Sequence, residues 1–191
     1  MEIFFSDIRN LNEDEAVSSG TSRAFGSCFA SSLLKLAVFK VYGISDLPAI
    51  KKEENGKPFF PLFTQIYFSL SHTKTHVLVA VSDFPVGVDV ENITPRSAKT
   101  ISKLATEKEL ADFSFHELWC LRESYFKLMG EGELRRLRFS REGNKIIATD
   151  SSVACRLYDN IPGCAAAASC YKPNVLPLYI SEVDSKLLIK N

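Results

Sequence analysis

Three consecutive apolar runs constrain the fold of this chain more than any other feature. They lie in "IYFSLSHTKTHVLVAVSDFPVGVDV", residues 66–90. Polar and turn-forming residues at 72–75 and 82–85 separate the runs, and valines at 86, 88 and 90 alternate with other residues. Short alternating or apolar runs bounded by such residues are typical of β-strands. The segment therefore predicts strand, turn, strand, turn and strand.

Helices are predicted on both sides of these strands. Segment 22–42 carries apolar residues at helical spacing and is followed by Gly43, a residue that commonly ends helices. A second, longer helix is predicted over about 107–129, with Gly130 after it. Further short strands are predicted at 135–139, 145–149, 153–158 and 178–182, and "CAAAASC" (164–170) is interpreted as a buried strand.

Size, charge and cysteine usage limit the classes of protein. A chain of 191 residues forms one large domain or two small ones with a proper core. The net charge of zero gives no global field that would attract nucleic acid or a membrane, and no apolar run approaches the roughly 20 residues of a membrane span. "MEIFFSDIRN" is a poor signal peptide, and five scattered cysteines without a CxxC pair favour reduced thiols. We expect a cytoplasmic protein that binds neither nucleic acid nor membrane.

Two carboxylates interrupt the third predicted strand. Asp89 and Glu91 are two residues apart in "GVDVENI", so they point to the same side of the strand and repel each other. Something must neutralise them. Oxygen ligands of this kind suit Mg²⁺, which takes one to three carboxylates and completes its shell with water and substrate phosphate.

The long helix offers a third acid. In "ELWCLRESYFKLMG", Leu118, Leu121, Tyr125 and Leu128 form the core stripe, whereas Trp119, Glu123 and Lys127 form a second column four residues apart. An exposed Glu123–Lys127 ion pair, worth about 0.3–0.5 kcal/mol, is the simpler interpretation of that column. The alternative is that Glu123 joins Asp89 and Glu91 around a hard cation while Lys127 contacts a phosphate.

Three further polar residues are candidates for the same site. Ser71 and His72 stand at a strand end in "SLSHTKTH", and Lys57 lies on the "NGKP" loop. Each has an ordinary alternative, because turn histidines with satisfied hydrogen bonds and solvated turn lysines are common.

Four motifs in order resemble one family. "GKP" (56–58), "SLSHT" (69–73), "GVDVE" (87–91) and "WCLRESYFK" (119–127) resemble the phosphopantetheinyl transferase superfamily in its longer, Sfp-type form. The close match covers about 56–127. The resemblance implies an α+β fold of two pseudo-symmetric halves, 1–84 and 85–191, with the active site between them.

The resemblance also implies a reaction. It implies Mg²⁺-dependent, or Mn²⁺-dependent, transfer of the 4′-phosphopantetheine arm of coenzyme A to a serine of an acyl, aryl or peptidyl carrier protein, with release of 3′,5′-ADP, by a monomer. Arg135, Arg136 and Arg138 are candidates for carrier contact.

The resemblance assigns roles to individual residues. Asp89, Glu91 and Glu123 match the metal ligands, and Glu123 also matches the favoured general base. Lys127 matches the lysine that contacts the coenzyme A phosphates. Ser71 and His72 match residues at the 3′-phosphate, Lys57 matches a lysine beside the nucleotide, and Glu109 is a looser match to a further acid.

Two departures from the family pattern leave other functions open. Arg122 stands where the family usually has lysine, and only Arg9 and Arg23 supply positive charge before residue 30. A metal-dependent phosphohydrolase or nuclease could use the same acids. An inactive module that binds coenzyme A or a carrier protein is the other alternative.

Overall fold

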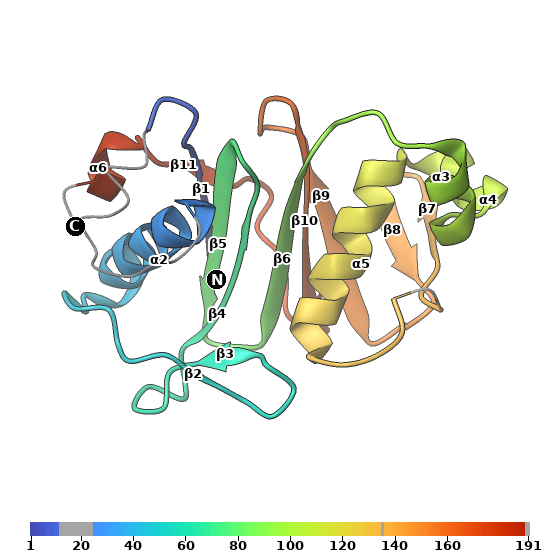
Figure 1. The fold of residues 1–191 in the computed structure, drawn as a ribbon. Coiled ribbons are helices and arrows are strands. Elements are labelled where there is room, and N and C mark those ends of the chain that lie inside the picture. The colour runs from blue at the N-terminus through green and yellow to red at the C-terminus, as the bar shows by residue number, and fades with distance from the viewer. Residues whose placement is uncertain (12–24, 135, 190–191) are drawn as a thin grey trace.

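The computed structural model describes residues 1–11, 25–134 and 136–189, and has an α+β fold. Two main β-sheets face each other, and each carries a long helix on its outer side (Figure 1). From one side to the other, the layers are helix α2, the first sheet, the second sheet and helix α5.

The first sheet has the strand order β11-β1-β5-β4. Its strands are β1 (Glu2–Asp7), β4 (Tyr67–His72), β5 (His76–Ser82) and β11 (Ser181–Glu182), and helix α2 (Phe25–Tyr42) covers its outer face. Every residue of β5 is buried, because its odd-numbered valines pack under α2 while Leu78 and Ala80 face the second sheet. A strand buried on both faces explains the continuous apolar run in the sequence.

The second sheet has the order β6-β10-β9 and is antiparallel throughout. Its strands are β6 (Val86–Asn92), β9 (Val153–Tyr158) and β10 (Cys164–Tyr171), and α5 (Phe115–Met129) covers its outer face. The three valines of β6 join the apolar layer between the sheets. Because side chains alternate along a strand, Gly87, Asp89 and Glu91 are left on the side of α5.

Smaller elements complete the chain. They are the hairpin β2–β3 (Lys51–Lys52, Pro58–Phe59), the hairpin β7–β8 (Phe139–Glu142, Lys145–Ala148) and the helices α3 (Ala98–Leu104), α4 (Glu107–Asp112) and α6 (Lys186–Ile189). The last strand, β11, pairs in parallel with β1, so the C-terminal segment returns to the first sheet. The predicted boundary between halves, at 84/85, falls in the turn between β5 and β6, which belong to different sheets.

Several predicted elements differ from the structure. The helix predicted over 107–129 is two helices, because Ser114 caps the start of α5 and forms a capping box with Glu117. The strand predicted at 135–139 begins only at Phe139, and that at 178–182 is reduced to two residues. The buried strand predicted at 164–170 is confirmed. The helix predicted from residue 22 is described from Phe25 onward, and residues 22–24 lie outside the described part.

Among the described residues, α2 alone is long and apolar enough to be considered as a membrane span. The expectation that no segment approaches such a length is therefore wrong for this helix. Its buried side packs on β5, as core helices of the same composition do.

The second sheet and α5 approach each other closely at Gly87. A Cβ atom at this position would lie 1.9 Å from the Ser124 carbonyl oxygen and 2.5 Å from the Leu128 amide nitrogen. Both atoms belong to the helix backbone and cannot move without shifting the helix. Glycine is needed here for space, not for an unusual backbone angle.

Gly87→Ala should destabilise the protein by about 2 kcal/mol or more, since overpacking of a well-packed contact costs about 1–3 kcal/mol. Urea denaturation measures the loss. Gly143→Ala is the matched control, because Gly143 has a φ of 58° and open space around it. Gly143→Ala should cost only about 1–2 kcal/mol, the penalty for placing a residue with a side chain in the left-handed backbone region. A smaller loss for Gly87→Ala than for Gly143→Ala would contradict the packing argument.

Candidate functional site

Asp89 lies at the centre of the candidate site. It sits in the middle of β6 and its carboxylate is buried, with the residue 4% exposed. Its Oδ1 atom accepts hydrogen bonds from Ser71 Oγ of β4, at 2.7 Å, and from Lys127 Nζ of α5, at 2.6 Å. One carboxylate oxygen thus joins the strand at the edge of the first sheet, the strand at the edge of the second sheet and the long helix.

Lys127 pairs with Asp89 and not with Glu123. The Nζ atom of Lys127 forms a salt bridge with Asp89, and this side chain is only 27% exposed. The simpler interpretation, an exposed Glu123–Lys127 ion pair on the helix surface, is therefore wrong. The lysine supplies part of the neutralisation that the two strand carboxylates require.

The two other acids are electrostatically coupled to Asp89. Burial and the charge of Asp89 raise the pKa of Glu91, although Arg96 and a hydrogen bond from Trp119 oppose this rise. Burial, followed by the charge of Asp89, also raises the pKa of Glu123. Arg96 stands 3.6 Å from Glu91 in a partly exposed ion pair. The predicted trio of carboxylates is thus gathered in one region where negative charge is in excess.

The chemistry of this region suits a hard cation. The second carboxylate oxygen of Asp89, Oδ2, is buried and has no hydrogen-bond partner among the described residues. A buried acceptor without a partner is costly, and a cation would satisfy it. Within the described ranges, however, no three His, Cys, Asp or Glu side chains converge closely enough to hold a metal as they stand. Instead of a third acid, Lys127 contacts Asp89 and donates a hydrogen bond to its Oδ1 atom.

His72 lies at the end of β4, against the first turn of α2. A Cβ atom at Gly26 would meet His72 Nδ1 at 2.6 Å, so the imidazole fits only because residue 26 is glycine. Burial and the charge of Lys127 lower the pKa of His72. The first turn of α2 contains no acidic residue. His72 and this turn thus form a surface without negative charge, which suits an anion.

Lys57 connects the β2–β3 loop to the end of α5. Its Nζ atom donates to the carbonyl oxygen of Leu128, at 2.6 Å, and burial lowers its pKa. A small pocket of about 200 Å³ lies between this loop and the helix. The residues that line it include Asn55, Gly56, Lys57, Pro58, Leu70, Phe126 and Lys127. The "GKP" motif and the helix motif therefore meet at one hollow, beside the Lys127–Asp89 pair.

Arg122 and Glu109 form a buried ion pair outside this region. Arg122 Nη2 lies 2.6 Å from Glu109 Oε1, and the two side chains are 1% and 3% exposed. The same Glu109 carboxylate caps α4 through Thr106 and accepts a hydrogen bond from the Phe139 amide of β7. The pair ties together α4, α5 and β7. The sequence could not predict this pairing, because it depends on how α4 folds against α5.

The arginines considered for contact with coenzyme A or a carrier protein either have other partners or lie outside the described part. Arg9 forms a bidentate ion pair with Asp7. Arg23 and Arg135 lie outside the described residues. Of the predicted carrier-contact arginines, Arg136 pairs with Glu133 in the open, and Arg138 lies 4.0 Å from Glu109.

Comparison with known proteins bears on this arrangement. Residues 85–165 match the model of the 4′-phosphopantetheinyl transferase superfamily. The predicted family resemblance is confirmed. The matched span contains β6, α5, β9 and the first two residues of β10, and thus Asp89, Glu91, Glu123 and Lys127. Lys57, Ser71 and His72 precede it.

Individual relatives agree with the family model. The chain is 27% identical over 111 residues to a 4′-phosphopantetheinyl transferase of Bacillus subtilis (52% of this chain, 50% of the relative). It is 32% identical over 120 residues to 4′-phosphopantetheinyl transferase gsp of Aneurinibacillus migulanus (57% and 50%). It is 26% identical over 140 residues to 4′-phosphopantetheinyl transferase Sfp of Bacillus subtilis strain 168 (64% and 62%). The match to the first two relatives spans about half of their length.

Arg122→Met should destabilise the fold by about 3–5 kcal/mol, because it removes the contacting countercharge of the buried Glu109 carboxylate and leaves only Arg138 at 4.0 Å. Urea denaturation gives the value. Arg136→Met is the matched control, since the Arg136 side chain is 83% exposed, and it should change stability by less than about 1 kcal/mol. Unchanged stability in Arg122→Met together with weaker nucleotide binding would contradict the structural role and return Arg122 to the site.

Proposed function

We propose that this protein transfers the 4′-phosphopantetheine arm of coenzyme A to a serine hydroxyl of an acyl, aryl or peptidyl carrier protein. The observation that carries the proposal is the meeting of Lys127 and Ser71 on the buried Asp89 carboxylate, with Glu91 and Glu123 coupled to it. These residues belong to motifs that resemble the superfamily, and four of them lie inside the matched span.

The nucleotide end of coenzyme A would be held by residues of both halves. The 200 Å³ pocket beside Lys57 and Lys127 offers apolar walls from Leu70 and Phe126, which suit a flat base. The 3′-phosphate would meet His72, beside the described start of α2. A dianion there would favour the charged imidazole, against the burial and the Lys127 charge that lower its pKa.

Asp89, Glu91 and Glu123 would hold the divalent cation, with Mg²⁺ the ion that best suits oxygen ligands alone. When bound, the ion would supply positive charge at the pyrophosphate. Lys127, which lies beside Asp89, would contact a phosphate oxygen. Ser71 would keep its hydrogen bond to Asp89 and so orient that carboxylate.

The remaining step is removal of the serine proton. Glu123 is half-buried, and burial and the charge of Asp89 raise its pKa, which strengthens it as a base. As it accepts the proton, the serine oxygen bonds to the phosphorus that carries the pantetheine arm. The bond from that phosphorus to the oxygen bridging to the nucleotide breaks, and 3′,5′-ADP leaves.

Glu123→Gln should reduce the transfer rate by about 10²–10⁴-fold, because the amide cannot accept the serine proton. Mass spectrometry of a carrier protein, incubated with coenzyme A and Mg²⁺ in single turnover, measures the rate. Glu117→Gln is the matched control on the same helix, since glutamine preserves the capping box at that position. Near-normal transfer by Glu123→Gln would remove Glu123 as base. No transfer by the wild type, with release of inorganic phosphate instead, would favour the phosphohydrolase.

Mg²⁺ should raise the melting temperature of the wild-type protein and have little effect on Asp89→Asn, because ligand binding to the native state stabilises it. The measurement is thermal unfolding with and without millimolar Mg²⁺. Asp159→Asn, in an exposed loop, is the matched control and should behave as the wild type does. Equal shifts in Asp89→Asn and the wild type would place the metal elsewhere.

A further inference from the structure

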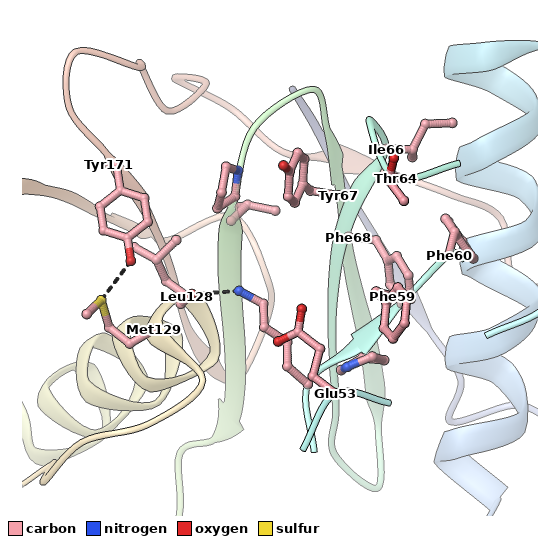
Figure 2. Close-up of a pocket in the computed structure, with 14 residues that line it drawn as sticks. Glu53, Phe59, Phe60, Thr64, Ile66, Tyr67, Phe68, Leu128, Met129 and Tyr171 are labelled. Atoms are coloured by element: carbon pink, nitrogen blue, oxygen red, sulfur yellow. Dashed lines mark hydrogen bonds between the residues drawn. The ribbon is translucent and has the colours of Figure 1, made fainter. Parts of the chain in front are cut away.

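A second, larger hollow lies on the other side of the Lys57 side chain. Its volume is about 500 Å³, within the range of small-molecule sites. It opens between the β2–β3 hairpin, the segment leading into β4, the β5–β6 turn and the end of α5 (Figure 2). Asp89, Glu91, Glu123, Lys127 and His72 do not line it. We call it the hairpin pocket.

The walls of the hairpin pocket are mainly aromatic and apolar. Phe59 and Phe68 come from the side of the first sheet, and Leu128, Met129 and Tyr171 come from the second half (Figure 2). Tyr171 donates its hydroxyl hydrogen bond to the Met129 sulfur, so the ring is held in place at the wall. Such rings favour a flat apolar ligand, because offset and edge contacts between aromatic groups add to simple burial.

Lys57 supplies a cation to this apolar lining. Its ammonium donates to the Leu128 carbonyl oxygen, which is a dipole and not a charge. In the part of the chain that the structure describes, no carboxylate lies within salt-bridge distance of Lys57 Nζ. Glu53, at the rim, acts on Lys57 only at longer range, and burial lowers the pKa of the lysine. An ammonium in this position has two further donors, and its countercharge, Glu53, does not contact it.

We propose that the hairpin pocket binds a small aromatic carboxylate, with its ring among Phe59, Tyr67 and Tyr171 and its carboxylate on the Lys57 ammonium. A carboxylate in contact with Lys57 accepts charge-assisted hydrogen bonds, which are stronger than neutral ones and which Glu53 does not form in the free protein. The ring packs against the apolar part of the lining, and the carboxylate meets its polar part.

A ligand in the hairpin pocket would weaken binding in the 200 Å³ pocket proposed for the nucleotide. Lys57, Pro58 and Phe68 line both the hairpin pocket and the 200 Å³ pocket. A carboxylate that holds Lys57 on one side withdraws it from a ligand on the other. This step rests on the proposed function, and it predicts mutual weakening of the two ligands, since coupling between sites is reciprocal.

Isothermal titration of the wild-type protein with 2-naphthoate and with its neutral analogue 2-naphthamide tests the site. Naphthoate should bind at least about tenfold more tightly than naphthamide, as expected for one hydrogen bond to a charged partner. Lys57→Met keeps the apolar stem and should remove this preference. Lys52→Met is the matched control, an exposed lysine on the same hairpin, and should keep it.

Two filling variants locate the bound molecule. Met129→Trp and Thr64→Trp each place an indole in the hairpin pocket from residues that do not line the nucleotide pocket. Whichever of the two folds, by circular dichroism, should lose naphthoate binding. Retention of naphthoate binding in a folded filling variant would overturn the proposal, as would equal affinities of naphthoate and naphthamide for the wild type.

A competition titration separates this proposal from the proposed function. Saturating naphthoate should weaken coenzyme A binding several-fold in the wild type and not in Lys57→Met. If the protein binds naphthoate in the expected pattern but no coenzyme A, the site stands and the transferase proposal fails. If coenzyme A binds and naphthoate does not, the site is overturned and the transferase proposal stands.

Discussion

The backbone contact between β6 and α5 at Gly87 sets the geometry of everything around it. A helix normally rests on side chains, but here the carbonyl of Ser124 and the amide of Leu128 lie where a Cβ atom would be. This close approach brings the end of α5 down onto the sheet. It places Lys127 within 2.6 Å of Asp89 and the Leu128 carbonyl within 2.6 Å of Lys57. The candidate nucleotide pocket and the hairpin pocket both depend on this one missing side chain.

Two cations meet the excess of negative charge in the same region. Lys127 contacts the buried acid, and Arg96 lies beside the more exposed Glu91. The two pairs differ, because a lysine that is paired with a buried carboxylate has lost much of its contact with water. Another positive charge must take its place before it can leave. Release of Lys127 from Asp89 would therefore require another positive charge at that carboxylate. Lysine suits this role better than arginine would, since its compact charge sits on a flexible stem.

The sequence predicted the faces of the elements well and the pairings poorly. Alternation in β6 placed Asp89 and Glu91 on one side, and helical spacing placed Glu123 and Lys127 together, because both follow from local geometry. The partner of Lys127 could not be predicted, since it depends on the distance between helix and strand. The break between α4 and α5 carried a readable signal in "SFHE", a capping box that the apolar periodicity masked.

Arg122 shows what local sequence patterns cannot predict. It stands four residues after Leu118 and one turn before Phe126, on a part of the helix that turns inward, and in the sequence it is noted only as the counterpart of a lysine in the family pattern. Its partner, Glu109, lies on a separate short helix whose orientation is set by the β7 strand. A buried ion pair between two helices is a property of the tertiary fold, so no local sequence pattern predicts it.

The apolar layer between the two sheets has a mechanical consequence. Valines of β6 and alanines of β10 interlock with Phe5, Leu78 and Ala80 of the first sheet, and the Val88 amide donates to Ser69 Oγ across the junction. Pulling the halves apart would expose this surface to water, so a hinge between them is expensive. A ligand that needs more room would therefore have to displace parts outside this layer, such as the β2–β3 hairpin, and leave the two sheets in place.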